Sequence, residues 1–439
     1  MSEDLQRPLA HGPLTPFQLA AIVVCVSLNM LDGFDILAMS FAASGVKADW
    51  HLADRQLGSL LSAGLVGMGV GSLTLASCAD RWGRRTIVLL SVGLACLGML
   101  ASAAAGNYLQ LLVLRVITGL GIGGTIASVA VIASEYSPDR WRGTVLAAYA
   151  TGYPIGATIG GAIAAYTIPH YGWRSAYAVG GVLTLLLFPV AWRRLPESLE
   201  FLLTRRPPGA LQRINELFVA IGRPALSALP AAAGSGSSAR PAARLAPPLT
   251  GSTLLVWTAF FCTMAGFYFI VSWTPRLLNA AGLSSVQGIT AGVLLNLGGI
   301  AGCGLFALSA ARAEAHRLLL ASLIGSAVLI AVFGMTLGRL EVALWTALLL
   351  GVISNAAMAG LYAVGPPLYP TAIRGTGMGW AVGIGRLGAI LAPLAAGALL
   401  ERGWVPSQLY WLFSVPFVVA AVAMLWIVPV RTRLPVAVG

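Results

Sequence analysis

Charged residues are scarce in this sequence of 439 residues: they make up 10% of it, whereas 58% of the residues are hydrophobic. So little charge excludes a soluble enzyme or a soluble binding module. Lysine is almost absent, since Lys47 is the only lysine beside 26 arginines. Together with a mean hydropathy of +0.84, these proportions indicate an integral membrane protein.

Cysteine and histidine are also rare. The five cysteines lie in or beside apolar runs without a CxxC pair, so we interpret them as packing residues and predict no disulfide. The four histidines have no partners at metal-ligand spacing, and we predict no metal site. No G-x-x-x-x-G-K-[ST] motif and no paired nucleophile and base are present, so we expect neither ATP use, nor a cofactor, nor enzyme activity.

Apolar windows of about 20 residues, the length that a helix needs to cross a bilayer, recur along the chain. We predict twelve membrane helices, in two groups of six within residues 1–192 and 251–439. The segment between them, residues 193–250, contains the helix-like stretch PPGALQRINELFVAIGRP. A stretch rich in Pro, Gly, Ser and Ala follows it, which is typical of a flexible linker.

The basic residues predict the orientation. With both termini and the central segment on one side, 19 of the 27 Lys and Arg lie on that side and 6 in the opposite loops, with Arg115 and Arg386 inside the bilayer. Since basic residues favour the cytoplasmic side, we expect cytoplasmic termini. This preference also explains the net charge of +12, so we predict no nucleic-acid partner. No small-residue cleavage site follows the first apolar run, so we expect no cleaved signal peptide.

The two groups of helices resemble copies of each other. The pattern P-x-x-x-R-G-T occurs at residues 138–144 and again 232 residues later, at 370–376. The same shift, within one residue, brings ADRWGRR at residues 79–85 onto ARAEAHR at 311–317. A duplicated six-helix unit predicts a ligand site near the membrane midplane, between the halves.

Two aspartates, Asp32 and Asp35, lie inside the first apolar run in the stretch LDGFDI. Three residues apart, they share a helix face, and about 13 residues at 1.5 Å each place Asp32 roughly 20 Å into the membrane. A carboxylate there costs about 2.5–3.5 kcal/mol, so the pair must face a cavity or a cation. We predict that they titrate as a coupled unit and carry a proton; the alternative is a structural role beside Gly33.

Two arginines also lie inside apolar runs. Arg115, in LVLRVITGLGIGG, needs an anionic partner, which is either Asp32, Asp35 or a bound substrate. We predict that Arg115 takes part in proton coupling, with a static ion pair as the alternative. Arg386, in GIGRLGAI, stands where the duplicate alignment places Pro154. Because a planar guanidinium suits bidentate capture of a carboxylate, we predict that Arg386 binds the substrate, with a helix–helix salt bridge as the alternative. The glycines that let the helix of Arg115 approach a neighbour are Gly119, Gly121, Gly123 and Gly124.

The twelve helices, ADRWGRR, LRVITGLGIGG and LPESLEFL together resemble the major facilitator superfamily. LDGFDI, NLGG at residues 296–299 and YPTAIRGTGMGWAVGIGRLGAI are similar to the aromatic acid:proton symporter family of bacteria. This resemblance implies an all-α membrane fold of two pseudo-symmetric halves. It also implies import of benzoate-like anions with protons for aromatic hydrocarbon catabolism, and a transport role for the DGFD pattern.

The remaining candidate residues fall into two groups. Aromatic and amide side chains on helices expected to face the substrate are weaker candidates for binding it, together with Asp35: Tyr153, Phe267, Asn296 and Trp380. By resemblance, the loop after the second helix serves in gating: Asp80, Arg81, Gly83, Arg84 and Arg85. Glu135 and Arg142 flank the loop after the fourth helix and are candidates for a second gating network, with a solvated ion pair as the alternative. The resemblance also implies a role in transport for Arg374, which we interpret as gating, with membrane anchoring as the alternative. The second loop copy lacks the acid of the first, which argues against a second lock.

We therefore expect a monomeric, multi-pass transporter of the bacterial inner membrane that imports a small aromatic carboxylate with protons by alternating access. Three alternatives remain open: an exporter, a transporter of another organic anion or metabolite, and a receptor that binds an aromatic acid without moving it. Exporters of the superfamily usually carry a Gly-Pro pair in helix 5, whereas here Tyr153 separates Gly152 from Pro154.

Overall fold

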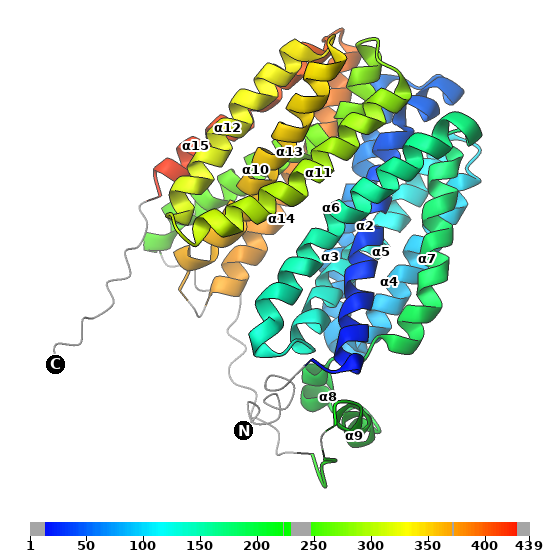
Figure 1. Cartoon of the computed structure of the whole chain (residues 1–439), viewed down its shortest axis with the longest axis vertical. Coiled ribbons are helices and arrows are strands. Elements are labelled where there is room, and N and C mark those ends of the chain that lie inside the picture. The colour runs from blue at the N-terminus through cyan, green and yellow to red at the C-terminus, as the bar shows by residue number, and fades with distance from the viewer. Residues whose placement is uncertain (1–13, 223, 230–246, 371–372, 428–439) are drawn as a thin grey trace, which may run out of the picture.

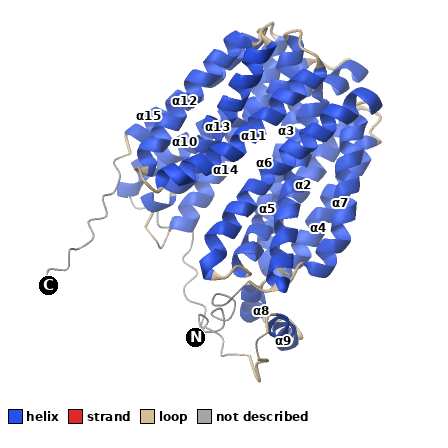
Figure 2. Cartoon of the chain, viewed as in Figure 1, coloured by secondary structure: helices blue, strands red, loops and turns tan. Residues whose placement is uncertain are grey.

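The long apolar runs fold into helices. The structure is a computed structural model that describes residues 14–222, 224–229, 247–370 and 373–427, and these residues form helices and loops without strands (Figure 2). The described helices of 20 residues or more are α2 (Pro16–Trp50), α3 (Asp54–Trp82), α4 (Arg84–Ala103), α5 (Tyr108–Glu135), α6 (Asp139–Tyr171), α7 (Arg174–Arg194), α10 (Pro247–Ala280), α11 (Ser285–Ala310), α12 (Ala315–Thr336), α13 (Leu340–Val364), α14 (Arg374–Glu401) and α15 (Pro406–Leu425).

Eleven of these twelve helices are long and apolar enough to cross a membrane. The exception is α6, whose stretch is rich in Gly, Ala and Thr and begins with charged residues. This helix packs against α2 and α11 inside the protein, so it needs less apolar surface than a helix that faces lipid. The twelve-helix prediction is thus confirmed, although α6 lacks the apolar character of the others.

Local sequence signals set the helix ends. Thr15 caps α2 by accepting a hydrogen bond from the Gln18 backbone N–H at 3.3 Å, while the Gln18 side chain accepts one from the Thr15 backbone N–H at 3.0 Å. Pro16 at the first position fits the start of a helix. The helix ends where His51 takes the left-handed conformation.

The two halves repeat the same helix pairings. In the amino-terminal half α3 packs on α5, α2 on α6 and α4 on both α5 and α7. In the carboxy-terminal half α11 packs on α13, α10 on α14 and α12 on both α13 and α15. When the six long helices of each half are matched in order, these are the same pairs. The shared pairing agrees with the duplication that the two sequence motifs indicate.

The segment between the halves lies at one end of the helix bundle. It forms α8 (Leu199–Arg205) and α9 (Ala210–Ala220) beneath the amino-terminal half, at what we call the linker end (Figure 1). Helix α9 matches the helix-like stretch in the sequence, whereas α8 was not expected. The predicted flexible linker falls largely on residues 230–246, which lie outside the described residues, as do the first 13 residues and positions 371–372.

Contacts between the halves concentrate toward the opposite end. There α3 packs on α14 and α6 on α11, and toward the linker end the two groups of helices diverge (Figure 1). Ser40 Oγ donates to the carbonyl oxygens of Val271 at 2.9 Å and Ser272 at 2.7 Å, and Ser62 Oγ donates to the Ile390 carbonyl at 2.8 Å. The halves are therefore closed at the opposite end in this structure.

Candidate functional site

The two aspartates of α2 are deeply buried. Asp32 is 5% exposed and Asp35 is 1% exposed. One oxygen of each carboxylate, Oδ2 of Asp32 and Oδ1 of Asp35, has no hydrogen-bond partner in the described part of the protein. A buried oxygen without a partner is costly, so both groups are poised to accept a proton, a water or a ligand.

The aspartates face different neighbours. Asp35 Oδ1 lies beside Gly180 of α7, where an added Cβ would come within 3.0 Å of it, so this carboxylate points into the amino-terminal half. Asp32 interacts electrostatically with Tyr149 and Tyr153 of α6 as well as with Asp35. Close packing brings α6 to this side of α2, because an added side chain at Gly33 would collide with the Tyr153 backbone.

Arg115 of α5 is 2% exposed and lies beside Asp35. Its Nη1 donates to the backbone oxygen of Asp35 at 3.2 Å, its Nη2 contacts Met99 Sδ at 3.0 Å, and its guanidinium carbon lies 4.8 Å from the Tyr177 ring centroid. Its charge also acts on the Asp35 carboxylate. Of the two aspartates considered as partners for Arg115, Asp35 is the one that it contacts.

A small crevice joins Asp35 and Arg115. It is lined by residues of α2, α3 and α5 and has a volume of about 10 Å³. That volume accommodates at most one water molecule, so an aromatic acid does not fit between the two side chains. The crevice suits a proton or a water better than a substrate.

Arg386 of α14 is half-buried in the carboxy-terminal half. Its Nη1 has no hydrogen-bond partner, and within the described residues it forms no ion pair with a carboxylate. Its charge acts on the hydroxyl groups of Tyr268 on α10 and Tyr362 on α13. The helix–helix salt bridge that the sequence left open is therefore not seen here, and the guanidinium is left with free donors.

Polar groups connect the two halves through their centre. Tyr153 of α6 interacts electrostatically with Asp32 on one side and with Tyr268 on the other, and Tyr268 interacts with Arg386. The series runs from the buried Asp32 of one half to the half-buried Arg386 of the other. The two tyrosines therefore lie between an acidic and a basic centre.

The weaker substrate candidates are scattered. Phe267 packs in an apolar cluster at the seam of α2, α6, α10 and α11, with its ring centroid 5.6 Å from that of Tyr268. The Asn296 amide donates to the Gly292 carbonyl of its own helix at 2.8 Å. Trp380 is 56% exposed and stacks on Trp257 with centroids 5.8 Å apart. Tyr153 and Phe267 are the two candidates with a described interaction with Tyr268.

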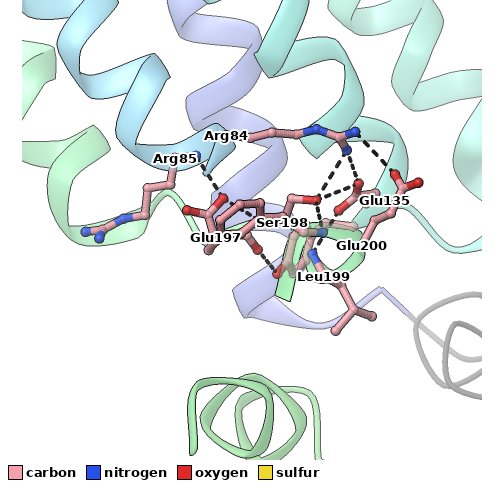
Figure 3. Close-up of polar contacts among 9 residues, drawn as sticks. Arg84, Arg85, Glu135, Glu197, Ser198, Leu199 and Glu200 are labelled. Atoms are coloured by element: carbon pink, nitrogen blue, oxygen red, sulfur yellow. Dashed lines mark hydrogen bonds and ion pairs between the residues drawn. The ribbon is translucent and has the colours of Figure 1, made fainter. Parts of the chain in front are cut away.

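A polar network at the linker end joins α4 and α5 to α8. Arg84 forms an ion pair with Glu135 and another with Glu200 at 3.2 Å (Figure 3). Glu135 also accepts from Ser198 Oγ at 2.9 Å and from the Leu199 backbone N–H at 3.0 Å. The carboxylate of Glu135 thereby holds the first turn of α8.

A second branch of this network starts at Arg85. Glu197 accepts a hydrogen bond from the Arg85 backbone N–H at 3.0 Å, and Arg85 Nε donates to the Leu195 carbonyl at 2.9 Å. Gly83 has φ +96° and lies against Glu197, where another residue would be strained and would collide. Tyr136 donates to the Glu197 carbonyl at 2.7 Å, and burial raises the pKa of Tyr136 well above its ordinary value, so it stays a neutral donor.

The other gating candidates lie outside this network. Arg142 pairs with Asp139 at 2.9 Å rather than with Glu135, so these two candidates are not brought together. Asp80 contributes its backbone oxygen, which accepts from Arg205 Nε at 2.9 Å. Arg81 and Arg374 are exposed, and Arg374 begins α14 at the linker end. In the second loop copy, Arg317 pairs with Glu314 at 2.7 Å on the surface.

Several residues of the site were not predicted. Tyr268 lies in an aromatic stretch of α10 that resembles a packing or lipid-facing stripe, and Tyr362 lies in an apolar helix without any motif. Glu197 and Glu200 belong to LPESLEFL. Two acids in a chain with 26 arginines could have indicated that this segment forms ion pairs. In the described residues no cluster of metal-ligating side chains is found.

Known proteins match nearly the whole chain. The model of the Major Facilitator Superfamily matches residues 23–337. A gallate transporter of Pseudomonas putida is 32% identical over 96% of this chain and 94% of its own length. The 4-hydroxybenzoate transporter PcaK of Pseudomonas aeruginosa is 32% identical over 96% of this chain and 95% of its own.

The fold has a counterpart among solved structures. The xylose transporter XylE from E. coli, in a partially occluded inward-open conformation, gives a TM-score of 0.76 at 15% identity over 94% of this chain and 98% of its own. This likeness confirms the predicted twelve-helix fold of two halves. Fold, family model and relatives together show that the chain is a multi-pass membrane transport protein that belongs to the major facilitator superfamily, with aromatic acid transporters among its relatives.

Proposed function

We propose that this protein imports a small aromatic carboxylate together with one or more protons, by alternating access. The observation that carries the proposal is the separation of two incompletely paired centres: the buried Asp32 and Asp35 in one half, and the half-buried Arg386 in the other. An acid pair suits a proton, and a free guanidinium suits a carboxylate. Relatives named for gallate, 4-hydroxybenzoate and benzoate support an aromatic substrate.

The proton would bind at the acid pair. Asp35 lies beside Arg115 and a crevice large enough for a water, whereas Asp32 faces Tyr153 and the centre. Protonation of Asp32 removes a negative charge from the path along which an anion approaches Arg386. Proton binding and anion binding therefore favour each other, and this linkage is reciprocal in free energy.

The anion would bind at Arg386. A carboxylate placed against the guanidinium gains charge-assisted hydrogen bonds, and the hydroxyls of Tyr268 and Tyr362 offer further donors. The edge and face of Phe267 supply an apolar wall beside Tyr268. Both the charge and the ring of an aromatic acid then have matching groups on the carboxy-terminal half.

The structure supports a conformation open toward the linker end. Its inter-half hydrogen bonds from Ser40 and Ser62 lie toward the opposite end, and the halves diverge at the linker end (Figure 1). We propose that the linker end faces the cytoplasm of a bacterium, since the arginine-rich loops gather there. The chain would then be open inward, and one monomer would contain the whole transport path.

Uptake into proteoliposomes tests the proposal. The panel contains gallate, 4-hydroxybenzoate, benzoate, gentisate, a phenylpropionate, a sugar and a dicarboxylate, each with and without an inward proton gradient. We expect gradient-driven accumulation of an aromatic acid by the wild type and none by Arg386→Gln. Accumulation of the sugar or dicarboxylate instead would favour a different substrate class. Outward movement against a proton gradient would favour an exporter, and binding without uptake a receptor.

A further inference from the structure

A second polar cavity lies at the linker end, away from the transport site. It has a volume of about 450 Å³ and is formed by the start of α4, the end of α7 and the face of α9. Four arginines line it, with two glutamates: Arg85, Arg193, Arg194, Arg213, Glu197 and Glu216. The lining therefore carries an excess of positive charge.

The glutamates of this cavity are already engaged. Glu197 Oε1 accepts from the backbone N–H groups of Arg85 at 3.0 Å and of Ser198 at 2.9 Å. Glu216 accepts from the Gln212 amide at 3.1 Å. Neither carboxylate forms an ion pair with an arginine of the cavity among the described residues, so the arginine charge is not neutralised from within.

Three of the arginines keep their donors free. Arg85 donates to the carbonyl oxygens of Leu195 and Trp192, which fixes its guanidinium at the end of α7. By contrast, no hydrogen bond or ion pair joins the side chain of Arg193, Arg194 or Arg213 to another described residue. Guanidinium groups gathered in this way match the oxygens of a phosphate, which accept hydrogen bonds from several arginines at once.

The cavity opens beside surface that faces lipid. On α7, Leu186 and Val190 are exposed and lie about two turns and one turn before Arg193, and on α4 the exposed Leu90 follows the cavity residue Thr86 by one turn. Trp192 is exposed at the same end of α7, as expected for a side chain at a membrane–water boundary. A phosphate in the cavity would therefore sit at headgroup depth, with apolar side chains extending from it into the bilayer.

We propose that this cavity binds the phosphate headgroup of an anionic phospholipid, whose acyl chains lie along α4 and α7. The lipid would join the ends of α4 and α7 to α9, beside the network of Arg85 and Glu197. This inference rests on the cavity alone and does not depend on which substrate the transporter carries.

Native mass spectrometry of the purified protein tests the proposal with phosphatidylglycerol and phosphatidylcholine as probes. The variant Arg193→Gln/Arg194→Gln/Arg213→Gln removes the three unpaired positive charges from the cavity. The matched control, Arg140→Gln/Arg312→Gln/Arg317→Gln, removes the same charge from exposed positions at the linker end. We expect the cavity variant to bind phosphatidylglycerol at least about tenfold more weakly, the control to bind it like the wild type, and phosphatidylcholine to bind all three alike.

Two outcomes would overturn the proposal. Equal binding of phosphatidylglycerol by the wild type and the cavity variant would show that the arginines do not hold the lipid. Displacement of phosphatidylglycerol by an equal concentration of inorganic phosphate would show that the cavity takes a free anion and that the lipid assignment is wrong. If the triple variant does not fold, the single variant Arg213→Gln, on the exposed face of α9, is expected to bind phosphatidylglycerol roughly fivefold more weakly. Binding as strong as that of the wild type would then contradict the proposal.

Discussion

A single arginine, Arg386, is the residue to which we assign binding of the anion. Arg386 Nη1 has no hydrogen-bond partner, although most buried polar side-chain atoms find one, and the charge of Arg386 acts on two tyrosine hydroxyls. We expect Arg386→Gln to weaken substrate binding by about 1.5–3 kcal/mol, because a charge-assisted pair is lost. Arg386→Lys keeps the charge without the bidentate geometry and should recover part of the affinity.

Calorimetric titration of the purified protein with the accepted acid measures this change. Arg402→Gln, an exposed arginine that caps the end of the same helix, is the control and should bind like the wild type. Unchanged affinity in Arg386→Gln would remove Arg386 from the substrate site.

The acid pair defines the proton side. Asp32→Asn and Asp35→Asn keep the shape of the side chain, but an amide does not take up and release a proton as a carboxylate does. We therefore expect both variants to lose substrate accumulation driven by a proton gradient. Exchange of labelled for unlabelled substrate needs no net proton movement, and at least one of the variants should retain it. Asp49→Asn, on the exposed end of the same helix, should behave like the wild type in both assays.

Normal gradient-driven accumulation in both Asp32→Asn and Asp35→Asn would mean that the pair is structural. The two assays are informative together, because a variant that merely misfolds loses exchange as well as accumulation.

The sequence predicted these charged residues better than their neighbours. A charge inside an apolar run is conspicuous, so Asp32, Asp35, Arg115 and Arg386 were recognisable without a structure. Tyr268 and Tyr362 were not, because an aromatic residue in a membrane helix is ordinary, and only the packing of α10, α13 and α14 brings these hydroxyls to Arg386.

Helix packing depends on glycines that the sequence did identify. Gly119 and Gly123 of α5 lie against the backbone of α3. Gly121 lies against α4, and Gly124 lies between Ser91 of α4 and Leu75 of α3. The prediction that this helix approaches a neighbour closely is confirmed, with the addition that it approaches two. The position of α8 was not predictable in the same way, because its seven residues are held by Glu135 and Arg84 from distant parts of the chain.

The network at the linker end gives a prediction for α8. Glu135→Gln removes the charge that pairs with Arg84 and weakens the acceptor of the Leu199 N–H. We expect faster hydrogen–deuterium exchange in residues 199–203, by about tenfold, since a buried charged hydrogen bond contributes about 1.5–3 kcal/mol. Exchange is measured by mass spectrometry of peptides from this segment.

Glu314→Gln serves as the control, because its pair with Arg317 is exposed and within one helical turn. It should leave the exchange of α8 unchanged. Equal protection of residues 199–203 in Glu135→Gln and the wild type would show that α8 is held by its apolar contacts instead.

At the scale of the whole molecule, the halves are held together at one end. Two serines of α3 make different hydrogen bonds. Ser62 donates to the Ile390 carbonyl of the other half, whereas Ser59 donates to the Arg55 carbonyl of its own helix. We expect Ser62→Ala to lose about 1 kcal/mol of this closure, which shifts the balance toward opening at that end by about fivefold. Ser59→Ala should shift nothing.

Distances between spin labels at Arg55 and Arg402, which lie at this end on different halves, report the opening. A longer distance population should grow in Ser62→Ala only. Identical distributions in both variants would mean that the Ser62 hydrogen bond does not stabilise the closed end.

The central claim is that an aromatic anion and a proton move in the same direction through one site. The most direct measurement is the internal pH of proteoliposomes when the accepted acid is added outside without an imposed gradient, with protein-free liposomes to correct for passive entry. We expect internal acidification that is lost in Asp32→Asn and Arg386→Gln. Substrate entry without a pH change, or with internal alkalinisation, would contradict it.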